Sequence, residues 1–136
     1  MRHTFIFSDF HLAPEAPGPG VWMRFRQRRY FPDEAFAGLV ERLLSQVGDA
    51  PLEVVFNGDT FELDGADGWS GPPDERPENV GRPPAEARAL DRILRDHHVF
   101  TAALCRLARR AERVVFVSGN HDQGLCWPVV QRVLEE

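Results

Sequence analysis

One stretch near the middle of the chain decides the fold: Val54-Val55-Phe56-Asn57-Gly58-Asp59-Thr60-Phe61-Glu62. It begins with three apolar residues without alternating polar positions and ends in a polar cluster. Short apolar runs of β-branched and aromatic residues are typical of strands that are buried on both faces of a parallel sheet. Two further runs, residues 4–7 and 114–117, have the same character. The sequence therefore predicts three buried strands.

Apolar residues at helical spacing fill the intervals between these strands. One helix is expected between Asp33, a good N-cap, and Gly48, a good stop signal. A second apolar stripe covers residues 90–111 and includes His97, which we expect to be a packed core residue. Pro128 is expected in the first turn of a third helix. This alternation predicts an α/β fold with right-handed crossovers and mainly parallel strands.

The bulk composition is that of a single domain. The chain has 136 residues, of which 43% are hydrophobic and 27% are charged, as in ordinary globular domains. No apolar run is long enough to span a bilayer, so no transmembrane segment is expected. Two cysteines and the lack of a signal-peptide pattern indicate a cytoplasmic protein. The net charge of −5 argues against a nucleic-acid partner.

Each predicted strand runs directly into a polar cluster. The three clusters are Ser8-Asp9-Phe10-His11, Asn57-Gly58-Asp59-Thr60-Phe61-Glu62 and Ser118-Gly119-Asn120-His121-Asp122. Because ligands of open α/β sheets bind just beyond the carboxyl ends of the strands, we expect the clusters to converge in space. An extended backbone would place Asp9 and His11 on the same side, as a claw of two metal ligands. Carboxylate and imidazole donors suit manganese, iron or zinc better than calcium.

Two more residues of these clusters have the chemistry of metal ligands. Gly58 lets the backbone turn tightly beside a metal, and the two oxygens of the Asp59 carboxylate can bridge two ions. Asn120 offers a neutral carbonyl oxygen. Each motif alone is more often a turn than a site. All three together, each directly after a buried strand, favour a metal site.

The three motifs together resemble a known family. Asp9-x-His11, Gly58-Asp59-x-x-Glu62 and Gly119-Asn120-His121-Asp122 are similar to the first three signature blocks of the calcineurin-like metallophosphoesterases. The resemblance implies the β-α-β-α-β portion of an α/β/β/α sandwich. The block that contains Glu62 is also similar to that of UDP-2,3-diacylglucosamine pyrophosphohydrolases, which usually have Arg where this chain has His121.

The resemblance also implies a site for two divalent ions, manganese first, with iron, zinc or magnesium as alternatives. Asp9 and His11 would bind the first ion. Asp59 would bridge both ions, and Asn120 would bind the second.

The remaining residues of the motifs would act on the substrate or support the ligands. His121 would be the acid that protonates the leaving oxygen or steadies the transition state, and Asp122 would orient it. Glu62 would hydrogen-bond around the site without binding metal.

The implied reaction is hydrolysis of a phosphoester or pyrophosphate bond in a phosphorylated small molecule or a nucleotide-type substrate. Two divalent ions about 3.5–4 Å apart clamp the attacking and leaving oxygens and lower the pKa of a bound water. Metal-bound hydroxide would then be the nucleophile.

The family also has a Gly-His block and a Gly-His-x-His block, which supply three further histidines. The five histidines here are His3, His11, His97, His98 and His121, and none follows a glycine. We therefore expect residues 1–136 to be a single domain that lacks its C-terminal half and holds the second ion weakly. Two alternatives stay open. One is a non-catalytic metal-binding or interaction module, or a truncated remnant; the other is a metal-dependent nuclease, which the net charge disfavours.

Two long loops, residues 12–32 and 63–84, interrupt the pattern. The first carries Arg24 and Arg26, which are candidates for substrate binding because Arg pairs well with phosphate. The alternative is a solvated loop with local aromatic packing. In the second loop, Trp69 is a candidate lid residue.

Overall fold

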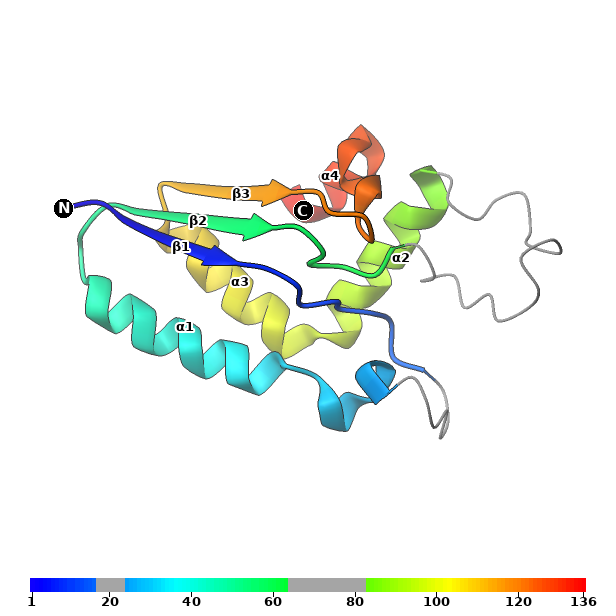
Figure 1. Ribbon diagram of the computed structural model, residues 1–136, viewed down its shortest axis with the longest axis horizontal. Helices are drawn as coiled ribbons and strands as arrows, with labels where there is room; N and C mark the ends of the chain where they lie inside the picture. Colours follow the sequence, from blue (N-terminus) through cyan, green and yellow to red (C-terminus); the bar gives the residue numbers. More distant parts are fainter. Residues whose placement is uncertain (17–23, 64–82) are drawn as a thin grey trace, which may run out of the picture.

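The computed structural model describes residues 1–16, 24–63 and 83–136 and shows a three-stranded parallel sheet with helices packed on it (Figure 1). The chain order is β1 (His3–Phe7), η1 (Arg24–Arg26), η2 (Arg28–Tyr30), α1 (Asp33–Val47), β2 (Leu52–Asn57), α2 (Pro83–Asp96), α3 (His98–Arg110), β3 (Arg113–Val117), η4 (Gln123–Cys126) and α4 (Pro128–Glu135). The predicted α/β class and the three strands are confirmed. Within the described ranges, no helix combines the length and the apolar character needed to cross a membrane.

The strands lie in the order β1-β2-β3, and both neighbouring pairs are parallel. The register aligns Phe7 with Phe56 and Phe56 with Phe116. The last two rings stack with their centroids 4.7 Å apart. Because all three strands point the same way, their carboxyl ends share one edge of the sheet, and this edge carries the three polar clusters.

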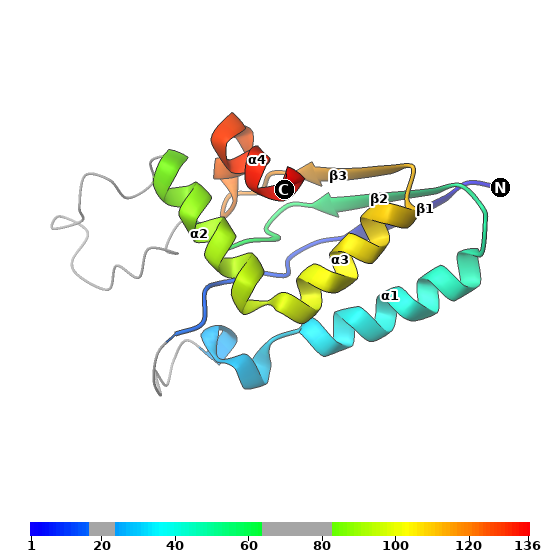
Figure 2. The ribbon, with the colours of Figure 1, turned by 180° about the vertical axis from the view of Figure 1, so that it is seen from behind.

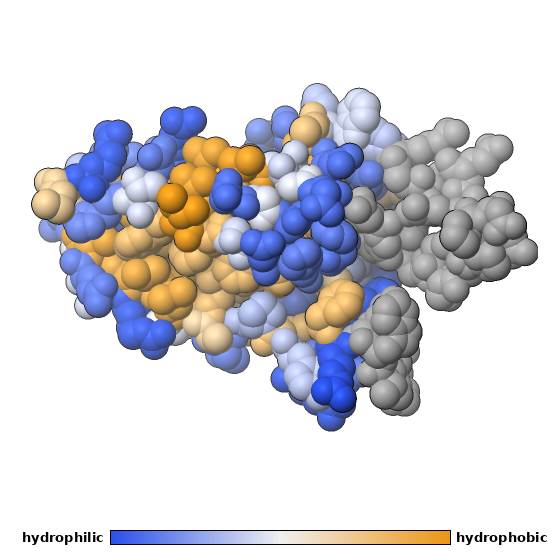
Figure 3. Space-filling model, viewed as in Figure 1, coloured by the Kyte–Doolittle hydropathy of each residue, from blue (hydrophilic) through white to orange (hydrophobic). Residues whose placement is uncertain are grey.

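The prediction that both faces of the sheet are buried is wrong for the described residues. Burial alternates along β2, where Val54 and Phe56 are fully buried against the helices. Figure 2 shows α1 and α3 in front of this face. The opposite face, hereafter the outer face, consists of Ile6, Val55, Val115 and Val117 together with polar neighbours. Ile6 is 67% exposed and Val117 is 44% exposed, and Figure 3 shows apolar residues gathered over the strands on this side.

Helix α1 ends as predicted but begins differently. Gly48 terminates the helix at a φ of 56°, and its N–H donates to the carbonyl of Leu44. Asp33 is the first helical residue, whereas the N-cap position is Pro32, which makes no side-chain cap. The carboxylate of Asp33 instead accepts a hydrogen bond from the ring of His97, so a tertiary contact replaces the predicted local cap.

The single apolar stripe predicted over residues 90–111 is two helices. Helix α2 ends at Asp96 and α3 starts at His98, with His97 between them at a φ of −96° and a ψ of 48°. His97 is buried, as predicted. The break leaves both helices with apolar faces on the same core, so the periodicity alone gave no sign of it. Helix α4 begins at Pro128, as predicted.

Candidate metal centre

The segments that follow the three strands are joined by main-chain hydrogen bonds. The N–H groups of Asp9 and His11 donate to the carbonyls of Gly58 and Asp59 over 3.2 and 3.0 Å. The N–H of Leu63 donates to the carbonyl of His121 over 3.0 Å. The three polar clusters therefore converge at the carboxyl edge of the sheet, as predicted.

The claw of Asp9 and His11 is formed by a turn and not by an extended segment. Asp9, His11 and Asp59 have φ values of 58°, 49° and 50°, and Gly58 has a φ of 83°. Left-handed backbone is uncommon outside glycine, although Asp and His tolerate it better than most residues. The predicted proximity is present, with His11 Nε2 lying 3.8 Å from Asp9 Oδ1. The predicted reason for it, side-chain alternation along a strand, is wrong.

Two groups of possible metal ligands share His11. In one group the ligand atoms of Asp9, His11 and Asp59 lie within 4.8 Å of one another, and in the other those of His11, Glu62 and His121 do. The two ring nitrogens of His11 face different groups: Nε2 faces Asp9, whereas Nδ1 lies 2.5 Å from Glu62 Oε1. Mixed carboxylate and imidazole donors of this kind fit manganese, iron or zinc.

Glu62 lies between the two histidines. Its Oε1 contacts His11 Nδ1 at 2.5 Å, and its Oε2 lies 3.2 Å from His121 Nδ1. The two imidazole rings are 5.1 Å apart and nearly perpendicular. A carboxylate that receives the second ring nitrogen of a ligating histidine fixes both the tautomer and the orientation of the ring. Glu62 thus contacts both histidines, and its carboxylate is also one of the possible ligands of the second group.

Asp122 holds the loops of the site together. It is fully buried, and its Oδ2 accepts the N–H groups of Thr60 at 2.8 Å and Phe61 at 3.4 Å. Its Oδ1 accepts the N–H of Gly119 at 2.6 Å. The sequence motif suggested a carboxylate that orients His121, but these contacts go to the backbone of two loops, and Glu62 lies beside the His121 ring.

Asp59 and Gly119 approach each other very closely. A Cβ added to Gly119 would lie 2.3 Å from Asp59 Oδ1 and 2.7 Å from its backbone nitrogen. The same Oδ1 accepts the N–H of His121 at 2.9 Å. Asn120 stands between Gly119 and His121 in the chain, and it is exposed. The glycine thus makes room for the carboxylate, a role that the motif alone did not reveal.

No protein-family model, curated protein or solved structure matches the chain. Function therefore has to be inferred from the site itself.

The arginine-rich segment packs on the loop that follows His11. Arg26 Nε donates to the carbonyl of Pro14 at 3.0 Å, and burial, followed by the nearby Arg92, lowers the pKa of Arg26. Arg29 lies over the ring of Tyr30 at 4.8 Å. These contacts favour local packing over substrate binding for Arg26. Arg24 is exposed. Trp69 lies outside the described residues.

Proposed function

We propose that this chain provides the first half of a divalent-metal-dependent phosphoesterase site. The observation that carries the proposal is the group of Asp9, His11 and Asp59 at the carboxyl edge of a parallel sheet, whose ligand atoms lie within 4.8 Å of one another. These side chains belong to the sequence motifs that resemble the calcineurin-like metallophosphoesterases. Substrates of the proposed reaction are phosphoesters or pyrophosphates.

The residues of the chain have distinct roles in this proposal. Asp9 and Asp59 would supply negative charge, and Asn120 would supply a neutral oxygen to the second ion. Bound divalent ions would neutralise the phosphoryl oxygens and activate a water molecule. Glu62 accepts the Nδ1–H of His11, which leaves Nε2 as the ligating nitrogen.

Glu62 Oε2 also lies 3.2 Å from His121 Nδ1, and its negative charge would favour the protonated His121 ring. To act as the acid, His121 would carry hydrogens on both ring nitrogens, and it would give the Nε2 proton to the leaving oxygen and remain as the neutral Nδ1–H ring. Asp122 keeps the segment of His121 attached to the segment that follows β2, through the amides described above.

We also propose that the outer face of the sheet is covered in the active protein by a second sheet, as in an α/β/β/α sandwich. The exposure of Ile6 and Val117 supports this proposal, because apolar residues of a parallel sheet are normally covered. The covering segment could also be the source of further metal ligands.

Manganese binding and turnover test the proposal together. The chain would be titrated with Mn²⁺ by electron paramagnetic resonance and calorimetry and then assayed with a generic phosphodiester. Asp59→Asn should weaken Mn²⁺ binding by more than roughly 10–100-fold, which is the typical effect of replacing a residue that only hydrogen-bonds to a metal ligand. Asp49→Asn, the same change at an exposed position outside both groups, is the matched control. Equal Mn²⁺ affinity in the two variants would refute the proposal.

The second candidate function is a non-catalytic metal-binding module that pairs with another segment. The uncovered outer face favours it. One tightly bound ion per chain, lost in Asp59→Asn but without any turnover, would select this candidate over the enzyme.

A further inference from the structure

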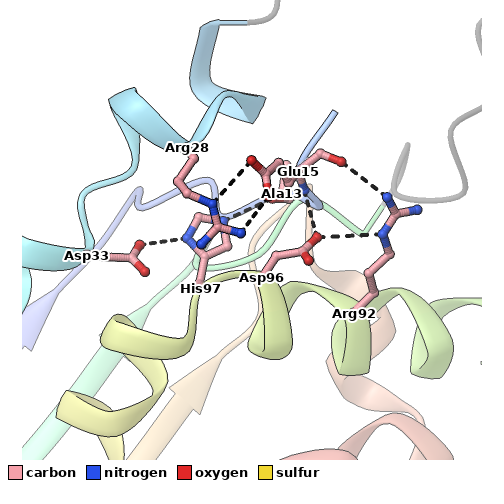
Figure 4. Close-up of polar contacts among 7 residues, drawn as sticks. All are labelled: Ala13, Glu15, Arg28, Asp33, Arg92, Asp96 and His97. Carbon is pink, nitrogen blue, oxygen red and sulfur yellow. Dashed lines mark hydrogen bonds and ion pairs between the residues drawn. The ribbon is translucent and has the colours of Figure 1, made fainter. Parts of the chain in front are cut away.

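His97 lies at the junction of α2 and α3, at the centre of the polar network that Figure 4 shows. Its ring is 1% exposed. Nδ1 lies 2.7 Å from Asp33 Oδ1, and Nε2 lies 3.0 Å from the carbonyl oxygen of Ala13. The ring of Phe31 stacks on it with a centroid separation of 3.8 Å. Both ring nitrogens are therefore directed at oxygen atoms.

These two partners determine the protonation state of the ring. A main-chain carbonyl can only accept, so Nε2 must carry a hydrogen. Asp33 stands in the first turn of α1, where the helix dipole stabilises an anion, and its Oδ2 also accepts the N–H of Phe100 at 3.4 Å. Both features favour the ionised carboxylate, so Nδ1 also donates. The ring is then a buried imidazolium.

The charges that surround His97 fit this state. Asp33 faces it from α1 and Glu15 from the loop after β1, whereas Asp96 precedes it on α2. The positive charges of the network are Arg28 of η2, which is paired with Glu15 over 2.6 Å, and Arg92 of α2, whose Nε lies 3.6 Å from Asp96. The pKa of Glu15 lies below its ordinary value, mainly through the hydrogen bond from Arg28 and to a smaller degree through His97.

The contacts of this network converge on the segment that follows the claw. His97 holds the carbonyl of Ala13, two residues beyond His11, and Asp96 accepts the N–H of Glu15 at 2.8 Å. We infer that His97 is a charged clamp that joins α1 to this segment and positions the turn of Asp9 and His11. The positioning role rests on the proposed function, whereas the clamp itself can be tested without metal.

The protonation state can be measured on the metal-free chain. Nitrogen-15 NMR of the histidine side chains near neutral pH should show hydrogen on both ring nitrogens of His97. Hydrogen on Nε2 alone would overturn the inference, because the clamp would then be neutral. This measurement uses the unmodified chain, so it does not depend on whether any variant folds.

Amide hydrogen exchange tests the positioning role. The N–H of Leu12 donates to the carbonyl of Thr60 and reports the order of the segment beside the claw. In His97→Gln its exchange should accelerate at least about tenfold, which corresponds to the loss of one charge-assisted hydrogen bond.

The control is Leu107→Ala. Leu107 is fully buried in α3, ten residues beyond His97 and about 15 Å from it. This substitution lowers global stability without touching the network, and the two variants would be compared at equal global stability. Equal acceleration at Leu12 in both would overturn the positioning role. If the unmodified chain does not bind Mn²⁺, that result would count against the proposed function but not against the clamp.

Discussion

Replacing Gly119 with alanine would displace the carboxylate of Asp59 and leave the residue itself unchanged. The backbone of Gly119 is not left-handed, so alanine is allowed there by conformation alone. The added Cβ would nevertheless lie 2.3 Å from Asp59 Oδ1, which is 0.7 Å inside the 3.0 Å limit that real Cβ contacts observe. Asp59 Cγ and the backbone nitrogen of Asp59 both lie at 2.7 Å, and because one of these atoms is backbone, a side-chain rotation alone does not relieve the clash.

The expected effect is larger on metal binding than on folding. Overpacking of this kind typically costs about 1–3 kcal/mol of stability. A ligand oxygen displaced by at least 0.7 Å exceeds the tolerance of roughly 0.2 Å within which metal–ligand distances normally fall. The hydrogen bond from the His121 N–H to the same oxygen would also lengthen. We therefore expect Gly119→Ala to lose most of the Mn²⁺ affinity while the chain still folds.

Urea unfolding and Mn²⁺ calorimetry measure the two effects separately. The matched control is Gly38→Ala in α1, where the nearest atom to the new Cβ is the Arg42 side chain at 3.8 Å. Because glycine is a poor helix former, this control should gain about 0.5–1 kcal/mol of stability and keep its Mn²⁺ affinity. If Gly119→Ala keeps both its stability and its Mn²⁺ affinity, the close approach to Asp59 has no functional meaning and the reasoning is refuted.

Three further predictions address the surroundings of the site. Glu62→Gln should reduce Mn²⁺ affinity or phosphodiester turnover by roughly 10–100-fold, and an unchanged titration and unchanged rates would remove Glu62 from the site. The pKa of Glu15 lies below its ordinary value of 4.5 because Arg28 hydrogen-bonds it. The stabilisation from this pair is therefore present above about pH 4.5 and is lost as the pH falls through the lower folded-state pKa. Arg28→Ala should move the Glu15 titration, followed by NMR, back toward 4.5, and no movement would contradict the assigned cause. Ile6→Lys should change the stability of this chain by no more than about 0.5 kcal/mol, and a loss of several kcal/mol on urea unfolding would show that the outer face is already covered in this chain.

The sequence predicted the parts of the fold that depend on local pattern. Three apolar runs identified the strands, and Gly48 and Pro128 marked a helix end and a helix start correctly. The break at His97 was missed because both halves of the stripe keep helical periodicity. Asp33 was misread as a cap because its partner, His97, is 64 residues away in the chain. Such tertiary partners leave no local signal.

For the site, the sequence predicted which segments meet but not how they meet. The three polar clusters converge because parallel strands share one carboxyl edge, a consequence of topology alone. The left-handed turns at Asp9 and His11 could not be read from residue types, since extended backbone is the default after a strand. The contact between Glu62 and both histidines depends on those turns. The assignment of metal-binding roles remains a prediction.

The backbone of the candidate site is strained at three residues. Asp9, His11 and Asp59 each hold a left-handed backbone, which disfavours the folded chain by roughly 1 kcal/mol per residue. Their ligand atoms also bring two carboxylates within 4.8 Å of each other, a repulsion of about 1 kcal/mol even at the dielectric constant of water. Strain of this kind persists only where the surrounding structure enforces it. Here the enforcing contacts are the main-chain bonds between the clusters and the buried carboxylate of Asp122. A divalent cation would turn the carboxylate repulsion into attraction, so the proposed metal site predicts that Mn²⁺ raises the free energy of unfolding of this chain.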